Sequence, residues 1–181
     1  MGSADKSSSN GLPEGFIAIR GRISETVTLP SGKVVPAPLI EEKILSEMPA
    51  LSHCMVVERP DKEYLSALLC LRVRIDEGVA RNVLHPKALA TSKGLGSKAR
   101  TTNDARTCRI WKKYIDDGMA RVNDAIEPDT NPLQQWRLLE TDFTEKGGEL
   151  TPTQKMRRGP TLAKHAEMVR SIVESVGGID E

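Results

Sequence analysis

Residues 51–76 read LSHCMVVERPDKEYLSALLCLRVRID, and they decide the fold of this 181-residue chain. They contain two apolar runs, LSHCMVVERP and YLSALLCLRVRID, which the polar turn DKE at residues 61–63 separates. Both runs are too continuous to be edge strands with one face in water, because such strands alternate apolar and polar residues. We therefore expect two strands at the centre of a sheet whose two faces are both covered.

The preceding segment predicts a small antiparallel ribbon and then a helix. The stretches FIAIRGR, TVTLP and VVP read as short strands, and SGK reads as a turn in which Gly32 can take a positive φ. Pro36 and Pro38 mark the start of the helix. Its apolar residues at helical spacing are Leu39, Ile40, Ile44, Leu45 and Met48.

The following segment predicts helices around one more strand. A short helix is expected near residues 86–92, a long helix from Asp104, a strand in PLQQWRLLETDF and a last helix from about Thr161. The stripe of the long helix, which we interpret as core packing, is Ile110, Trp111, Ile115, Met119, Val122 and Ile126. The face of the last helix is Leu162, Ala166, Val169, Ile172 and Val173. This order predicts an α+β domain, with helices packed on a small, mostly antiparallel sheet.

Composition restricts the class of protein. Hydrophobic residues make up 38% and charged residues 28%, as in a globular domain with a modest core. The net charge of +1 argues against a nucleic-acid-binding protein. Three Cys without CxxC spacing argue against a disulfide framework, and three widely spaced His argue against a zinc site.

A basic loop, GGELTPTQKMRRG at residues 147–159, allows two interpretations. Lys155, Arg157 and Arg158 could be the solvated start of a helix, or one of them could reach an active site and bind a carboxylate or a phosphate. Arg157 and Arg158 fit the first interpretation better. Because a helix dipole disfavours cations at the N-terminus, we expect an ion-pair partner to compensate them.

Two stretches, GRISETVTLPSGKVVPAPLIEE at residues 21–42 and WRLLETDFTEKGGELTPTQKMRR at residues 136–158, carry a family resemblance. They resemble the two signature stretches in the C-terminal domain of adenylate-forming (AMP-binding) enzymes, and most closely the bubblegum-type long-chain fatty acyl-CoA synthetases. The first stretch matches at Gly21, Arg22, Glu25, Gly32, Pro36, Ile40 and Glu41. The second matches at Phe143, Gly147, Gly148, Glu149, Leu150, Pro152, Thr153, Lys155, Arg157 and Arg158.

The resemblance implies a domain organisation. Residues 1–15 would be a disordered N-terminal segment, residues 16–176 the C-terminal lid domain of an acyl-CoA synthetase, and residues 177–181 a tail. Within the lid, residues 77–134 would be a helical insertion of the subfamily. The large N-terminal domain of the family has no counterpart in these residues.

The resemblance also implies roles for five residues. Lys155 would be the catalytic lysine that contacts the carboxylate and the α-phosphate of ATP, and Arg22 would bind ATP at its phosphate or ribose oxygens. Ser24 stands at the hinge about which the lid rotates between half-reactions, where the family usually has Lys or Asp. Gly32 and Lys33 would lie on the loop that faces coenzyme A.

The expected function is that of the C-terminal portion of a long-chain fatty acid–CoA ligase, inactive without the N-terminal ATP- and acyl-binding domain. ATP and Mg²⁺ would be bound mainly by that domain, and coenzyme A would be the co-substrate. The partners would be the long-chain fatty acid, ATP, coenzyme A and the adenylation domain, with no nucleic acid and no transmembrane segment. We expect a cytoplasmic location, or a peripheral one at the endoplasmic reticulum. The alternative is a non-catalytic interaction module that retains the lid fold.

Overall fold

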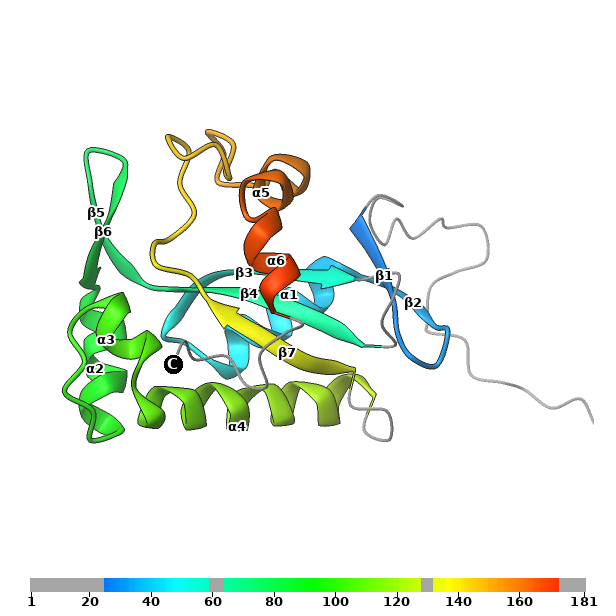
Figure 1. Ribbon diagram of the computed structural model, residues 1–181, viewed down its shortest axis with the longest axis horizontal. Helices are drawn as coiled ribbons and strands as arrows, with labels where there is room; N and C mark the ends of the chain where they lie inside the picture. The colour runs from blue at the N-terminus through cyan, green and yellow to red at the C-terminus, as the bar shows by residue number, and fades with distance from the viewer. Residues whose placement is uncertain (1–24, 59–63, 128–131, 173–181) are drawn as a thin grey trace, which may run out of the picture.

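A three-stranded sheet between two layers of helices forms the body of the protein (Figure 1). The computed structural model describes residues 25–58, 64–127 and 132–172. The strands are β1 (Thr26–Thr28), β2 (Val34–Pro36), β3 (Leu51–Glu58), β4 (Leu65–Leu71), β5 (Val73–Asp76), β6 (Val79–Leu84) and β7 (Leu133–Leu138). The helices are α1 (Ala37–Glu47), α2 (Pro86–Gly94), α3 (Thr102–Arg106), α4 (Arg109–Ile126), α5 (Arg158–Lys164) and α6 (Ala166–Ser171).

The strand β4 lies at the centre of the sheet, between antiparallel β3 and parallel β7. All seven of its residues are buried, as its continuous apolar run predicts. The expectation that β3 is also central is wrong, because β3 forms one edge of the three-stranded sheet among the described residues, and β7 forms the other. Its apolar run reflects cover on both faces rather than a strand on each side.

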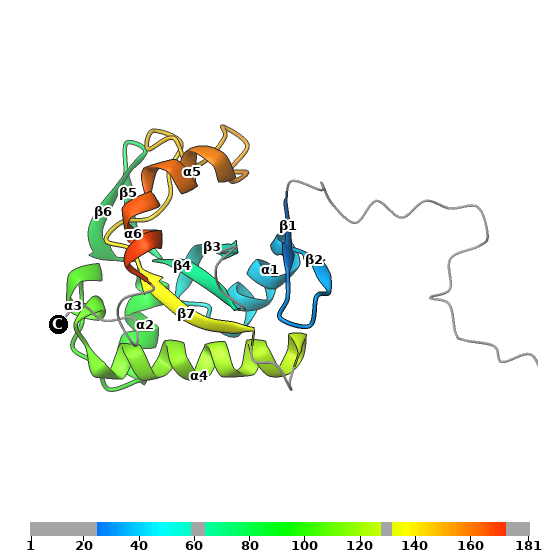
Figure 2. The ribbon, with the colours of Figure 1, turned by 45° about the vertical axis from the view of Figure 1, so that its right-hand side comes forward.

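The two faces of the sheet belong to two separate clusters of apolar side chains. Alternate side chains of a strand point to opposite faces. Leu69 and Leu71 of β4 therefore pack with α1 and α4, whereas Leu68 and Cys70 pack with α6 and the loop before α5. Figure 2 shows this layering, with α4 below the sheet and α5 and α6 above it.

The parallel strand β7 is fixed at its start by a buried side chain of α4. The amide of Asn123 donates to the Leu133 carbonyl at 2.9 Å and accepts from the Leu133 amide at 2.8 Å. Farther along the strand, the Trp136 indole donates to Asp116 of α4 at 2.8 Å. The long helix therefore sets where the last strand joins the sheet.

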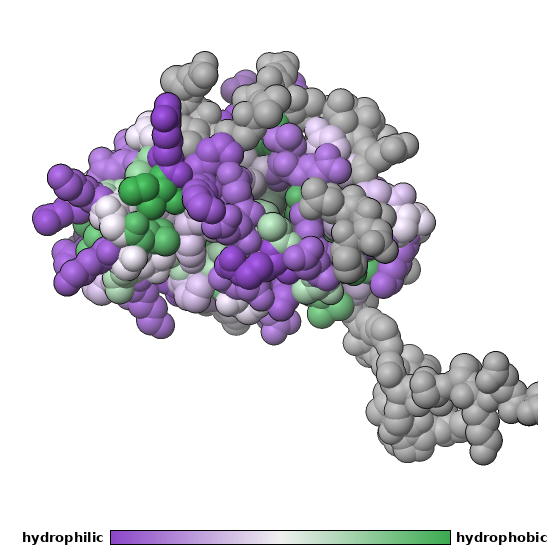
Figure 3. All heavy atoms as spheres, turned by 90° about the horizontal axis from the view of Figure 1, so that it is seen from below, coloured by the Kyte–Doolittle hydropathy of each residue, from purple (hydrophilic) through white to green (hydrophobic). Residues whose placement is uncertain are grey.

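The helix α4 confirms the predicted amphipathic stripe, with one exception. Trp111, Ile115, Met119 and Val122 are buried, but Ile110 is 41% exposed. Seen from below, the surface of the molecule is mostly hydrophilic, with a small hydrophobic patch toward the end where α2 and α3 lie (Figure 3). In α1, likewise, Ile40, Ile44 and Met48 are buried, whereas Leu39 lies on the solvent side at 57% exposure.

The segment between β4 and α4 departs from the sequence prediction. The second apolar run breaks at Arg72, and its last residues form β5, which pairs with β6 in a hairpin that the polar sequence did not predict. The expected short helix is present as α2. The long helix expected from Asp104 is two helices: a capping box of Thr101 and Asp104 starts α3, which ends at Arg106, and α4 begins at Arg109.

The predicted last helix is also broken, at His165, into α5 and α6. Val169 and Ile172 are buried as predicted, but Leu162 is 43% exposed. Other expectations concern residues outside the described ranges. These are the disordered segment 1–15, the strand FIAIRGR, the turn at 61–63, Val173 and the tail 177–181.

We predict that Gly118→Ala destabilises the packing of α4 on α1. A Cβ atom at this position would meet the Met48 side chain, at 2.6 Å from Cγ and closer still to Sδ. Overpacking should lower the free energy of unfolding by about 1–2 kcal/mol despite the better helix propensity of Ala, as measured by chemical denaturation.

The matched control is Gly94→Ala in α2, where nothing lies within 4 Å of the added atom. This variant should be neutral or slightly stabilised. Equal losses for both variants would contradict the packing argument.

Candidate active site

The basic loop folds into a small hairpin that carries Lys155. Residues 149–151 and 155–157 form its two arms, with the Thr151 amide donating to the Lys155 carbonyl at 2.8 Å and the Arg157 amide donating to the Glu149 carbonyl at 2.7 Å. A tight turn joins them, closed by a hydrogen bond from the Gln154 amide to the Thr151 carbonyl, with Gln154 at φ 60°. The Lys155 backbone is therefore fixed, because its own carbonyl is bonded to Thr151 and because Gln154 before it and Arg157 after it are bonded as well.

The hairpin directs the Lys155 side chain outward. Leu150 and Met156 form an isolated bridge and pack on the cluster around α6. Since neighbouring side chains of an extended arm point to opposite sides, Lys155 must face away from this core. Within the described residues, no hydrogen bond or ion pair engages its ammonium group, and the residue is exposed.

A cleft of about 730 Å³ lies beside Lys155. It is lined by Glu25, Thr151, Lys155, Met156, Arg157, Arg158 and Gly159. Three cationic side chains and one carboxylate therefore border the same space. Such a lining suits an anionic group more than an apolar one.

The glycine pair at the base of the hairpin has two distinct physical roles. A Cβ at Gly147 would collide with the Glu149 carboxylate and lie 2.9 Å from the Thr144 hydroxyl. Gly148 instead has open space but a φ of +88°, which L side chains rarely adopt. The GGE sequence is thus required by close packing at one residue and by backbone conformation at the next.

Glu149 anchors this loop to α5. Its side chain is only 4% exposed and pairs with Lys164, whose ammonium also donates to the Gly147 carbonyl at 3.1 Å. Burial by itself would raise the pKa of Glu149, but the hydrogen bond from Lys164 and those from backbone amides outweigh it and lower the pKa. The carboxylate therefore stays ionised and keeps the hairpin attached to the helix behind it.

Arg158 has the ion-pair partner that the sequence predicted for the start of this helix. Its guanidinium donates twice to Glu41 Oε1, at 2.9 and 2.6 Å, and the Val56 amide donates to the same oxygen at 2.8 Å. Burial raises the pKa of Glu41, and Arg158 opposes that rise. Arg158 thus joins α5 to α1 and β3, whereas Arg157 donates to the Gly148 carbonyl at 3.4 Å.

The other candidate residues lie elsewhere. Gly32 takes a φ of +81° in the turn between β1 and β2, as predicted, and Lys33 beside it is exposed. This turn lies well apart from the Lys155 hairpin in both ribbon views (Figures 1 and 2). Arg22 and Ser24 fall outside the described residues, so their roles stay predictions. Glu25, which follows Ser24, borders the Lys155 cleft.

Sequence reasoning missed a polar cluster under the hairpin. The ring of Phe143 lies 5.9 Å from the rings of both His53 and His165. His53 pairs with buried Asp142 at 2.7 Å, and His165 lies 3.7 Å from Glu149. Burial lowers the pKa of His165, although Glu149 opposes this. The ETDF stretch was the available signal, because a carboxylate beside a buried Phe needs a partner.

The described residues contain neither a metal cluster nor a membrane-spanning helix. In the described ranges, no three or more His, Cys, Asp and Glu side chains gather as metal ligands would. None of the helices in those ranges is both long enough and apolar enough to cross a membrane. Cys54, Cys70 and Cys108 are free thiols.

No protein-family model matches the chain. Curated relatives do match it. The chain is 31% identical over 162 residues to long-chain-fatty-acid–CoA ligase ACSBG1 of Macaca fascicularis, covering 87% of this chain and 22% of the relative. It is 32% identical over 168 residues to long-chain-fatty-acid–CoA ligase ACSBG2 of Xenopus laevis, covering 90% and 22%. The chain thus spans between a fifth and a quarter of the length of these relatives.

The fold also matches a solved adenylation domain. The A domain of carboxylic acid reductase from Segniliparus rugosus, solved with AMP and a co-purified carboxylic acid, superposes with a TM-score of 0.63 at 16% identity. The match covers 91% of this chain and 22% of that one. At this identity the likeness demonstrates a shared fold, and it confirms the predicted α+β class.

We predict that Arg158→Ala destabilises the protein in a pH-dependent way. The variant leaves the buried Glu41 carboxylate without its cation, which should cost about 2 kcal/mol at pH 7. Because the folded pKa of Glu41 is already raised, its contribution to stability is present below its ordinary pKa and is lost as pH rises through the folded value. Losing Arg158 raises that pKa further, so the difference in the free energy of unfolding between the parent protein and the variant should grow as the pH rises. Denaturation of both proteins between pH 4 and pH 7 measures this.

The control is Arg121→Ala, which breaks an exposed pair with Glu47. It should lose much less stability. A deficit for Arg158→Ala that stays constant across the pH range would contradict the assigned role of Glu41.

We predict that Gly147→Ala loosens the hairpin base. The new methyl must displace Glu149 or Thr144, so the variant should lose about 1–3 kcal/mol of stability by overpacking. Hydrogen exchange at the Gly148 and Leu150 amides should be faster in the same variant. Gly159→Ala, with open space around the added atom, should change neither quantity.

Proposed function

Because this chain belongs to the adenylate-forming, or AMP-binding, superfamily, we propose that it is the C-terminal lid domain of a long-chain fatty acid–CoA ligase. Its substrates would be a long-chain fatty acid, ATP with Mg²⁺ and coenzyme A. The ATP and the acyl chain would be bound mainly by a preceding adenylation domain. The lid alone is expected to be inactive. The proposed setting is the cytoplasm or the surface of the endoplasmic reticulum.

The observation that carries this proposal is the presentation of Lys155. The hairpin fixes the Lys155 backbone by hydrogen bonds on both sides, while the ammonium stays exposed at a cleft bordered by Arg157 and Arg158. Lys164, by contrast, pairs with the buried Glu149 and so serves to hold the loop to α5. An unpaired cation on a rigid support is suited to meet an anion supplied by another domain.

The chemistry of the first half-reaction needs such a cation. An oxygen of the fatty acid carboxylate would bond to the α-phosphorus of ATP, and the bond from that phosphorus to the bridging oxygen of pyrophosphate would break. Both reacting groups are anions, so they repel each other as they approach. The Lys155 ammonium would offset that repulsion without taking or giving a proton.

The second half-reaction would use a different part of the domain. The coenzyme A thiolate would attack the acyl carbon of the adenylate and release AMP. Gly32 and Lys33 are proposed to face coenzyme A at this step, after rotation of the lid about Ser24. In support, the turn between β1 and β2 is exposed and lies apart from the Lys155 hairpin, so one orientation need not serve both steps.

A second candidate function is an interaction module that retains the lid fold. Ser24 favours it, because the resembling enzymes usually carry a charged residue at the hinge. Such a module would dock on a separate synthetase and would not need Lys155 for binding.

We predict that Lys155→Ala removes the first half-reaction. The assay measures pyrophosphate release from ATP and a long-chain fatty acid, with this chain alone and then joined to the adenylation domain of a related ligase. The joined protein should be active, and Lys155→Ala should lower its rate by about 100-fold or more, as loss of a transition-state cation does elsewhere. Thioester formation from preformed acyl-adenylate and coenzyme A should change little.

The matched control is Lys113→Ala, an exposed lysine of α4 far along the chain, which should retain full activity. Activity that survives Lys155→Ala would overturn the assigned role. A stable complex with a synthetase that is inactive and indifferent to Lys155 would favour the interaction module.

A further inference from the structure

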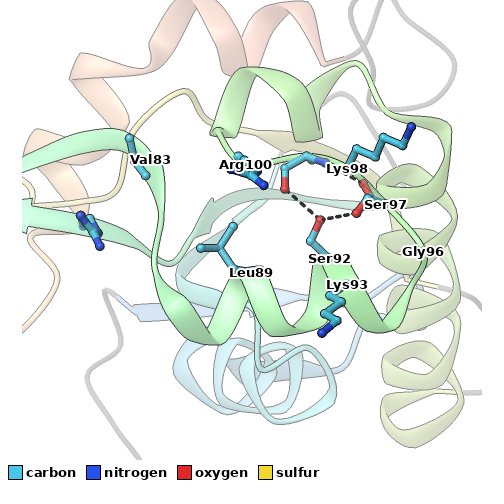
Figure 4. Close-up of a pocket in the computed structure, with 10 residues that line it drawn as sticks. Val83, Leu89, Ser92, Lys93, Gly96, Ser97, Lys98 and Arg100 are labelled. Atoms are coloured by element: carbon cyan, nitrogen blue, oxygen red, sulfur yellow. Dashed lines mark hydrogen bonds between the residues drawn. The ribbon is translucent and has the colours of Figure 1, made fainter.

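A second basic cavity lies at the opposite end of the fold from the ribbon β1–β2, among the β5–β6 hairpin, α2 and the segment before α3. Its volume is about 790 Å³. It is lined by Arg74, Val83, Leu89, Ser92, Lys93, Gly96, Ser97, Lys98, Ala99 and Arg100. Figure 4 shows Arg100 and Leu89 near the middle of this ring, with Lys98 to the upper right, its side chain extending outward, and Lys93 below. Nothing assigned to the ligase reaction involves these residues.

One wall of the cavity is a short extended segment that presents two cations on the same side. Residues 98–100 alternate exposed, buried and exposed, so Lys98 and Arg100 face outward while Ala99 packs inward at 7% exposure. Thr101 forms a bridge with Val83, and the Leu84 amide donates to the Arg100 carbonyl at 2.9 Å. The wall is therefore attached to β6.

A buried hydroxyl fixes the same wall to α2. Ser92 is 2% exposed, and its hydroxyl contacts the Ala99 carbonyl at 2.9 Å and the Ser97 carbonyl at 3.3 Å. The dashed lines of Figure 4 trace these two bonds. With one edge bonded to β6 and the other to α2, Lys98 and Arg100 start from a rigid backbone.

The charges around the cavity are not neutralised by the described part of the chain. Arg74, Lys93, Lys98 and Arg100 line it, and no carboxylate of residues 25–58, 64–127 or 132–172 does. No ion pair engages any of these four side chains within the described ranges. The acid nearest Arg100 in sequence, Asp104, accepts hydrogen bonds from the Arg100 and Thr101 backbone amides at 2.9 Å each, in its capping role.

We propose that this cavity binds a phosphate-bearing ligand with an apolar portion. Four cations favour a group that carries more than one negative charge, and a phosphate monoester carries between one and two at neutral pH. Arginine presents a fork of donors that matches phosphate oxygens. Val83 and Leu89 offer an apolar surface for the rest of the molecule, and the volume suits a ligand of nucleotide size.

Calorimetric titration of the 181-residue chain with ADP at low ionic strength tests this proposal. We expect saturable binding that weakens with added salt, and no binding of adenosine. Lys98→Ala and Arg100→Gln should each weaken binding about tenfold, the loss typical of one charge-assisted hydrogen bond. Both side chains are exposed, so both variants should melt as the parent protein does.

Two controls separate this cavity from other basic sites. Lys87→Ala changes an exposed lysine of α2 that does not line the cavity, and Lys113→Ala changes an exposed lysine of α4 outside both basic sites. Neither should alter ADP binding. Binding that falls with Lys155→Ala but not with Arg100→Gln would place the ligand at the hairpin cleft and overturn the proposal.

A second experiment identifies the kind of molecule that carries the phosphate. Vesicles of phosphatidylcholine with phosphatidic acid are compared with vesicles of phosphatidylcholine alone in a flotation assay. Binding only to the acidic vesicles, lost with Arg100→Gln, would identify a lipid headgroup, whereas binding only to ADP would identify a soluble ligand. Binding to neither, or binding that both cavity variants leave unchanged, would overturn the proposal.

Discussion

The Glu41 carboxylate is the interaction on which the arrangement of this domain depends. One of its oxygens accepts from Val56 of the edge strand β3 and twice from Arg158 at the start of α5. An unpaired strand edge invites non-native pairing, and here a side chain of α1 caps it. The same atom connects the helical layer below the sheet to the layer above it. The position of α5, and with it the hairpin that Glu149 and Lys164 attach to that helix, follows from this single buried charge.

Periodicity and apolar content were enough to predict the strands β3, β4 and β7 and the helices α1 and α4, since each buries a long face. These two signals failed to predict element boundaries where a capping residue or a charged residue ends or starts an element within an apolar pattern. Thr101 and Asp104 start a short helix that ends before the long one begins at Arg109, and Arg72 ends a run that looked continuous. The hairpin β5–β6 was missed because Ile75 and Val79 are exposed, so no buried face marks it in the sequence. The parallel pairing of β7 with β4 depends on tertiary packing, which no local sequence pattern predicts.

The candidate site was predictable to the extent that it rests on local motifs. The turn at Gly32, the outward Lys155 and the need of Arg158 for an anionic partner all follow from short stretches of sequence. The identity of that partner does not, because Glu41 is distant in the chain and is brought close only by the packing of α1 against β3. The same holds for the His53–Asp142 pair, which joins β3 to the segment after β7. An ion pair between distant segments can be identified only once the fold is known.

The position of β7 also constrains how the chain can be synthesised. The strand β4 ends at Leu71, but its second neighbour begins only at Leu133, after the β5–β6 hairpin and three helices have been made. During translation, one edge of the central strand β4 therefore has no hydrogen-bonded neighbour until these elements and β7 have been synthesised. Non-local pairing of this kind forms slowly, and an open, mostly apolar strand is prone to associate with other chains. The order of the elements therefore leaves the sheet incomplete until β7 has been made, before any question of catalysis arises.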